Sequence, residues 1–159
     1  MNNNQRNELV KILQDEHKNL LQYACYRTGV MPDAEDAVQD AMTKMLACEG
    51  NIENLKGYLY QTVAHACMDI VRKRQKMQTE GIEIMKLWRY ENNDDFSQEF
   101  RRIARMLDQI PEEQSEVIRL RYYAEKSFAE IAEMLNLPLP TVKSRFLYGL
   151  SKIKKSLTA

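Results

Sequence analysis

Residues 127–145 read Ser-Phe-Ala-Glu-Ile-Ala-Glu-Met-Leu-Asn-Leu-Pro-Leu-Pro-Thr-Val-Lys-Ser-Arg. Ser127 and Glu130 have the spacing of a capping box, in which each side chain binds the other residue's backbone amide at a helix start. Asn136 tolerates a left-handed turn conformation, and Pro140 suits the first turn of a new helix. The stretch therefore predicts two helices joined by a tight turn, which is a helix-turn-helix.

The second helix of this motif has the side chains expected of a helix that enters the major groove of DNA. Helical spacing turns Val142, Phe146 and Leu150 inward and leaves cations, hydroxyls and an apolar group facing outward, where they suit phosphates and base edges. No acidic residue occurs from Met134 to the C-terminus, which favours DNA over a merely solvated face. The predicted DNA-facing side chains are Arg121, Thr141, Lys143, Ser144, Arg145, Leu147 and Tyr148.

The rest of the chain is also predicted to be helical. Only five glycines and four prolines occur in 159 residues, and 44% of the residues are hydrophobic and 29% charged, as in folded soluble proteins. Apolar spacing predicts a helix over Leu9 to Ala24, a second one capped by Asp33, and a third from about Tyr58 to Gln75. Pro111 is expected to open a helix that runs to Tyr123.

These elements predict an all-α protein of two small helical domains. We expect the first domain over residues 1–76, a linker over 77–98 and the helix-turn-helix domain over 99–159. Within the linker, Met85 to Trp88 is a candidate short helix, and Trp88 is expected to pack on a neighbouring lobe. The formal net charge is zero, but basic residues gather near the C-terminus and at Arg72 to Lys76, so the charge is segregated.

Several classes of protein are disfavoured. The cysteines, Cys25, Cys48 and Cys67, are odd in number and form no C-x-x-C pair, which favours reduced thiols over a disulfide framework or a zinc ribbon. Neither a signal peptide nor a stretch long enough to insert in a membrane is evident, so we expect a cytoplasmic protein. No cofactor-binding motif or catalytic constellation appears, and we expect no enzyme, no cofactor and no metal.

The stretch from Leu107 to Tyr122, followed by 127–135 and Thr141 to Arg145, closely resembles region 4 of the extracytoplasmic-function sigma factors of RNA polymerase. The resemblance implies an alternative sigma factor that binds the polymerase core and directs promoter-specific initiation. It assigns the helix-turn-helix to the −35 promoter element. The family usually has glycine at the position of Pro140, a difference that touches only the shape of the local loop.

Two segments of the first domain are similar to region 2 of the same family. The segment Asp33 to Asp40 resembles the helix that docks on the clamp of the polymerase's largest subunit, which implies a docking set of Asp36, Gln39, Asp40 and Lys44. Residues 58–74 resemble the helix that opens and reads the −10 element, and the loop before it captures a flipped base. The −10 set that this implies is Asn51, Asn54, Tyr58, Tyr60, His65, Asp69, Arg72 and Lys73.

The resemblance also implies partners. These are the polymerase core, through its clamp and the flap of its second subunit, promoter DNA, and an anti-sigma factor of the kind that is often membrane-bound. The acidic segment Glu91 to Asp95 suits a strand-mimicking path toward the polymerase active-site channel. His65 replaces the family's usual asparagine, which implies an unusual −10 specificity.

Two other functions remain open at this point. A helix-turn-helix regulator that acts without replacing sigma would bind duplex DNA tightly by itself, usually as a dimer. A metal-dependent helical enzyme could use His65 and Asp69, one helical turn apart. His17 is the only other histidine, so a complete ligand set is hard to assemble.

Overall fold

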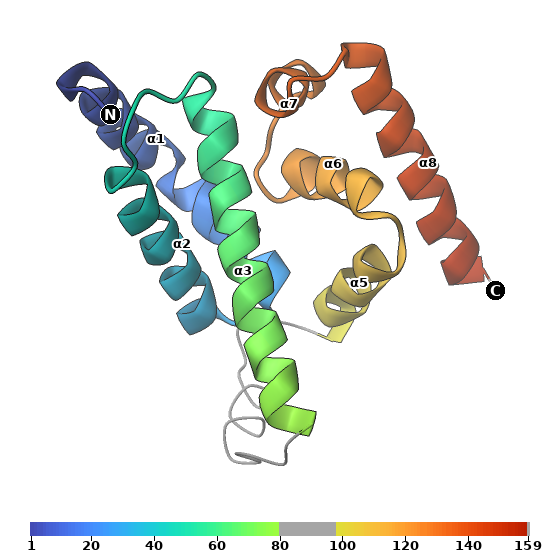
Figure 1. Ribbon diagram of the computed structural model, residues 1–159. Helices are drawn as coiled ribbons and strands as arrows, with labels where there is room; N and C mark the ends of the chain where they lie inside the picture. The colour runs from blue at the N-terminus through green and yellow to red at the C-terminus, as the bar shows by residue number, and fades with distance from the viewer. Residues whose placement is uncertain (80–97, 159) are drawn as a thin grey trace.

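The computed structural model describes residues 1–79 and 98–158, and these residues form seven helices and no strand (Figure 1). The prediction of an all-α protein is confirmed. The predictions for Met85 to Trp88, for the packing of Trp88 and for Glu91 to Asp95 lie outside the described residues.

Three helices form the N-terminal lobe: α1 (Asn3–Thr28), α2 (Met31–Leu46) and α3 (Leu55–Thr79). Each of the three packs on the other two. At the start of α1 the Asn2 side chain accepts a hydrogen bond from the Gln5 amide at 2.8 Å, and the helix ends at a left-handed glycine. The core of the lobe consists of apolar side chains from all three helices, including Leu9, Leu20, Ala37, Met45, Leu59 and Val63.

The predicted cap of α2 is wrong. The N-cap is Val30 in an extended conformation, and Asp33 already lies in the first turn because Pro32 fixes a helical backbone ahead of it. The Asp33 carboxylate is nearly buried and lies 3.2 Å from the guanidinium of Arg74 on α3. Asp33 therefore ties α2 to α3 instead of capping its own helix.

The start of α3 also differs from the prediction. The helix begins at Leu55, where we expected about Tyr58, and it continues to Thr79. Asn54 precedes the helix, and its side-chain oxygen accepts the Gly57 amide at 3.3 Å. Because asparagine is among the best N-cap residues, this bond accounts for the earlier start.

The C-terminal lobe contains α5 (Gln98–Gln109), α6 (Glu112–Tyr122), α7 (Phe128–Leu135) and α8 (Leu139–Thr158). Helix α8 packs mainly on α6 and α7. Gly149 makes this packing close, because a β-carbon there would lie 2.7 Å from Ile118 Cδ1. On α6, the buried Arg119 guanidinium binds Glu112 of its own helix at 3.3 Å and Asp108 of α5 at 2.9 Å, and the second bond joins α5 to α6.

The two lobes pack against each other. Helix α7 lies against the N-terminal part of α3, and α6 contacts α1 (Figure 1). One continuous group of buried apolar side chains includes Leu59 and Val63 from the first lobe and Leu120, Ile131 and Met134 from the second. The apolar core therefore runs through the boundary between the lobes.

Candidate nucleic-acid interface

The helix-turn-helix forms as its sequence predicts. Ser127 Oγ accepts the Glu130 amide at 3.1 Å, and the Glu130 carboxylate accepts the Ser127 amide at 3.2 Å, so the capping box is complete. Asn136 ends α7 with φ 55°, in the left-handed region. These local interactions fix the turn that sets α8 against α7.

The predicted DNA-facing residues of α8 differ in how exposed they are. Lys143, Ser144, Leu147 and Tyr148 are exposed, and the last two each keep 64% of their surface accessible. An exposed leucine beside an exposed tyrosine suits contact with bases or a protein partner better than contact with water. Thr141 and Arg145 are half-buried, and the Arg145 guanidinium lies 3.5 Å from Glu113 on α6.

Arg121 has structural contacts that the sequence did not suggest. Its guanidinium donates to the Lys126 carbonyl at 3.2 Å and lies over the ring of Phe128, 4.6 Å from the ring centre. Both contacts hold the turn between α6 and α7. Arg121 is exposed, its contact with the DNA backbone stays a prediction, and its observed contacts position the start of α7.

The predicted docking residues lie together on one helix. Asp36, Gln39, Asp40 and Lys44 are all exposed on α2, while Ala37, Val38 and Ala41 between them are buried. The spacing of three and four residues places the polar side chains on one face. This face carries two carboxylates and a cation toward solvent.

The predicted −10 residues are divided between exposed and engaged positions. On α3, His65, Arg72 and Lys73 are exposed, and Arg72 pairs with Asp69 at 2.5 Å. Tyr58 is 43% exposed, and in the preceding loop Asn51 is exposed and accepts the Asn2 amide at 3.2 Å.

Asn54 and Tyr60 do not join this exposed group. The Asn54 amide nitrogen donates to the backbone carbonyls of Glu133 at 2.8 Å and Met134 at 3.0 Å, at the end of α7. Tyr60 is only 2% exposed, and its hydroxyl donates to Glu16 at 2.9 Å. Burial, together with the adjacent Glu16 charge, raises the pKa of Tyr60 well above its ordinary value, so the phenol stays protonated.

Sequence reasoning missed a buried ion pair between the lobes. The Lys126 ammonium lies 2.5 Å and 2.7 Å from the two Glu16 oxygens, and both side chains are about 95% buried. Burial raises the pKa of Glu16, but the hydrogen bonds from Lys126 and Tyr60 outweigh it, so the pKa lies below its ordinary value. Glu16 falls between Ile12 and Leu20 on the apolar stripe of α1, and that position could have identified it.

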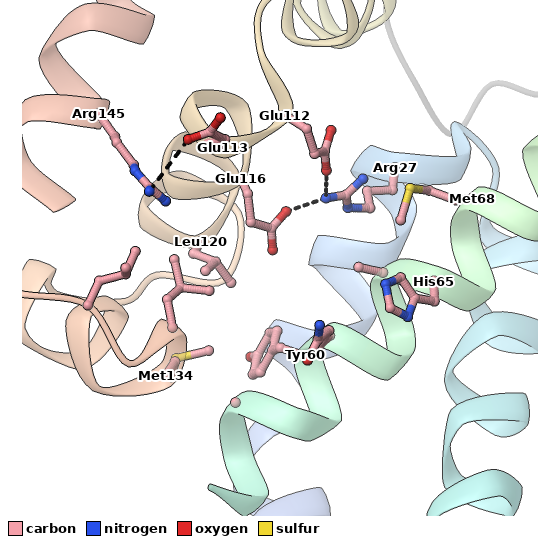
Figure 2. Close-up of a pocket in the computed structure, with 15 residues that line it drawn as sticks. Arg27, Tyr60, His65, Met68, Glu112, Glu113, Glu116, Leu120, Met134 and Arg145 are labelled. Carbon is pink, nitrogen blue, oxygen red and sulfur yellow. Dashed lines mark hydrogen bonds and ion pairs between the residues drawn. The ribbon is translucent and has the colours of Figure 1, made fainter. Parts of the chain in front are cut away.

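A second polar cluster joins α1 to α6 (Figure 2). Arg27 pairs with Glu112 at 2.6 Å and also with Glu116, and Glu116 accepts the Tyr23 hydroxyl at 2.6 Å. Burial would lower the pKa of the guanidinium, but the surrounding oxygens raise it, so Arg27 stays charged. The cluster borders a cavity of about 420 Å³, whose other walls include Leu120, Met134 and Tyr60 from both lobes.

Comparison with known proteins identifies both lobes. Residues 12–77 match the family model of sigma-70 region 2, and residues 100–153 match that of sigma-70 region 4. The chain belongs to the sigma-70 family. Within that family it is an extracytoplasmic-function sigma factor, an alternative sigma that directs promoter-specific transcription initiation.

Two curated relatives span nearly the whole chain. RNA polymerase sigma factor SigV of Bacillus subtilis (strain 168) is 26% identical over 156 residues, which cover 94% of this chain and 91% of the relative. ECF RNA polymerase sigma factor SigW of the same strain is also 26% identical, over 90% of this chain and 86% of the relative. The sigma factor thus aligns with these relatives through both regions.

Two solved structures share the fold. CnrH, in complex with the cytosolic domain of CnrY, aligns over 96% of this chain and 89% of CnrH with a TM-score of 0.63 at 19% identity. RpoE from Bartonella quintana, in complex with the anti-sigma factor NepR, covers 98% of both chains with a TM-score of 0.56 at 22% identity.

Two further findings concern the described part of the sigma factor. No helix there is long and apolar enough to cross a membrane. No group of three metal-binding side chains occurs there either, and Asp69, half of the candidate His65–Asp69 pair, is engaged by Arg72.

Proposed function

We propose that three exposed faces divide the work of initiation among them. The face of α8 with Lys143, Ser144, Leu147 and Tyr148 reads the −35 element, with Thr141, Arg145 and Arg121 beside it. Helix α3 and the loop before it read the −10 element. The polar face of α2 docks on the polymerase clamp. In this scheme residues 1–76 and 99–159 are the two functional domains, and 77–98 link them.

The observation that carries this proposal is the exposed face of α8. Leu147 and Tyr148 stand out from a helix that is anchored beneath by Val142 and Gly149, both buried. Lys143 and Ser144 lie one turn earlier and supply a charge and a hydroxyl. A cation for phosphate, a hydroxyl for base edges and an apolar group for a thymine methyl make the set that readout in the major groove uses.

The proposed partners extend to an inhibitor. Both solved relatives are complexes, CnrH with the cytosolic domain of CnrY and RpoE with the anti-sigma factor NepR. We infer that this sigma factor also has an anti-sigma partner, and that its C-terminal domain reaches the polymerase flap. It acts in the cytoplasm and catalyses no reaction of its own.

Run-off transcription tests the assignment. Sigma-free polymerase core is combined with the protein, with the DNA upstream of its own gene and a pool of genomic fragments as templates. We expect transcripts that require the protein, and Asp40→Ala should weaken its binding to core about tenfold, because the substitution removes an exposed docking carboxylate. Asp15→Ala also removes an exposed carboxylate, from α1, and should leave core binding unchanged.

The alternative function predicts a different result in the same experiment. No transcripts and no co-elution with core, together with tight binding to duplex DNA alone, would make the protein a helix-turn-helix regulator that does not replace sigma.

A further inference from the structure

The N-terminus of α3 and the C-terminus of α7 meet in an unusually close backbone contact. Asn54 uses both ends of its carboxamide: the oxygen caps α3 through the Gly57 amide, and the nitrogen binds the last carbonyls of α7. The last turn of an α-helix leaves carbonyls without the usual partner four residues on, and of these two only the Glu133 carbonyl also accepts a local amide, that of the C-cap Asn136 at 3.3 Å. One side chain thus caps a helix in each lobe.

Gly57 makes the contact possible. A β-carbon at this position would lie 2.2 Å from the Met134 carbonyl oxygen, far inside van der Waals contact with a backbone atom. Gly57 lies within the first turn of α3 and is not needed for a positive φ, since the left-handed glycines of the described residues are Gly29 and Gly50. Its lack of a side chain serves the approach of α7.

The contact continues along the boundary between the lobes. The buried Glu16–Lys126 pair lies beside it, Lys56 adds a second cation 3.2 Å from Glu16, and Tyr26 stacks on Tyr123 with ring centres 3.5 Å apart. We call the contacts of Asn54 and Gly57 with α7, together with the Glu16–Lys126 pair, the clasp.

The clasp engages part of the residue set proposed to read the −10 element, here called the −10 reader. The residue set proposed for the −35 element, the −35 reader, stays open. The donor group of Asn54 is used by α7, and Tyr60 lies beneath the boundary, bound to Glu16. A nucleotide base needs free amide groups and an open aromatic face. In this arrangement neither Asn54 nor Tyr60 can offer them.

We propose that the packed arrangement is an autoinhibited form of the sigma factor, in which the C-terminal lobe holds Asn54 of the base-capturing loop and keeps Tyr60 beneath the boundary until the clasp opens. The inference rests on the proposed function and describes how that function is regulated. The partner of the −10 loop in the resting protein is thus the chain's own α7.

The chemistry of the clasp suits a contact that opens. Burying an ion pair costs desolvation energy that nearly cancels the attraction between the charges. A buried pair therefore fixes the relative position of the two lobes more than it adds to stability. When the lobes separate, Glu16 and Lys126 return to water and recover that cost. Residues 80–97 connect α3 to α5 in the sequence, so the separated lobes stay on one chain.

Two substitutions break the clasp, of which Gly57→Ala also brings a β-carbon within 2.8 Å of Asn54 Nδ2 and so displaces the carboxamide that caps α3. Gly57→Ala places a methyl group against the Met134 carbonyl, whereas alanine is a better helix residue than glycine in the lobe by itself. Asn54→Asp keeps the capping oxygen of α3 but removes both donors to α7. The matched control is Asn51→Asp in the same loop, where the exposed side chain acts as an acceptor and aspartate can replace it.

The first measurement is small-angle X-ray scattering of the free full-length chain. We expect a compact wild type and Asn51→Asp variant, and a larger radius of gyration for Gly57→Ala and Asn54→Asp. Circular dichroism should show unchanged helix content, so that opening is distinguished from unfolding. Scattering curves of Gly57→Ala and Asn54→Asp that both match the wild type would overturn the clasp.

The second measurement is the rate of open-complex formation by Gly57→Ala with polymerase core, on the template found by run-off transcription. Asn54 is a proposed base contact, so its variant is not used here. If the clasp holds most molecules closed, opening it should raise the rate about tenfold. An expanded Gly57→Ala protein that initiates no faster than wild type would overturn autoinhibition.

Failure of the proposed function can be distinguished from failure of the clasp. If neither wild type nor Gly57→Ala supports transcription, the sigma assignment fails and autoinhibition fails with it. The scattering comparison involves no polymerase and still decides whether the clasp holds the lobes together.

Discussion

The two proposed DNA-reading surfaces differ in how the fold presents them. The −35 face on α8 is open, with Leu147 and Tyr148 each 64% exposed. The −10 surface is partly covered, since Asn54 is bonded to α7 and Tyr60 is buried. The same helix-turn-helix lobe therefore exposes its own proposed reading surface and engages part of that of the other lobe.

The difference shows that exposure of a recognition helix does not make a chain ready to bind its target. A DNA contact through α8 needs no change in the packing of the lobes. A base contact through Asn54 or Tyr60 requires the boundary to open first. The comparison thus predicts that substitutions at the boundary and substitutions on α8 affect different steps.

The largest effect is expected for Lys126→Glu. The substitution sets a second carboxylate against the buried Glu16, and removing one partner of a buried pair costs about 3–5 kcal/mol. We expect the equilibrium between closed and open lobes to shift at least about 100-fold toward open, measured by scattering of the free chain.

The matched control for this reversal of charge is Lys155→Glu, which changes an exposed side chain of α8 and should leave the chain compact. Closed lobes in Lys126→Glu would mean that the ion pair does not hold the boundary, and the contrast between the two readers would then rest on Asn54 and Gly57 alone.

A smaller effect, confined to the open surface, is expected for Arg145→Ala. The ion pair with Glu113 is partly exposed, and such pairs contribute little to stability, so the guanidinium can turn to DNA. Loss of a base contact costs about 1–3 kcal/mol, and affinity for the −35 duplex should fall about 10-fold to 100-fold in a filter-binding or fluorescence titration.

Glu113→Ala provides the opposing control, because it removes the competitor for Arg145 and should leave affinity equal or slightly higher. An Arg145→Ala protein that binds the duplex as tightly as wild type would remove this residue from the −35 reader.

The smallest effect is expected for Arg121→Ala. Its bond to the Lys126 carbonyl and its contact with the Phe128 ring stabilise the turn before α7, and together they contribute about 1 kcal/mol. We expect a melting temperature lower by a few degrees and a salt slope of DNA binding reduced by about one, because the proposed phosphate contact is lost. An unchanged salt slope would remove Arg121 from the −35 set and leave it only the turn before α7.

Local sequence determined much of this protein. The capping box of Ser127 and Glu130, the left-handed Asn136 and the apolar spacing of α2 and α3 set the helices, because caps, turns and periodicity depend on neighbours within a few residues. The same spacing placed Asp36, Gln39, Asp40 and Lys44 on one exposed face. Errors arose where a local signal had a stronger distant partner, as when Asp33 paired with Arg74.

Only the tertiary structure decided how the lobes meet. The Glu16–Lys126 pair joins residues 110 positions apart, and the close approach of Gly57 to Met134 joins α3 to α7. Such contacts leave little trace in a single sequence, because a charged residue on an apolar stripe or a glycine in a helix has many possible reasons. The sequence thus pointed to the surfaces that we propose to read DNA, and the packing decided which of them is open, because burial depends on segments far apart in the chain.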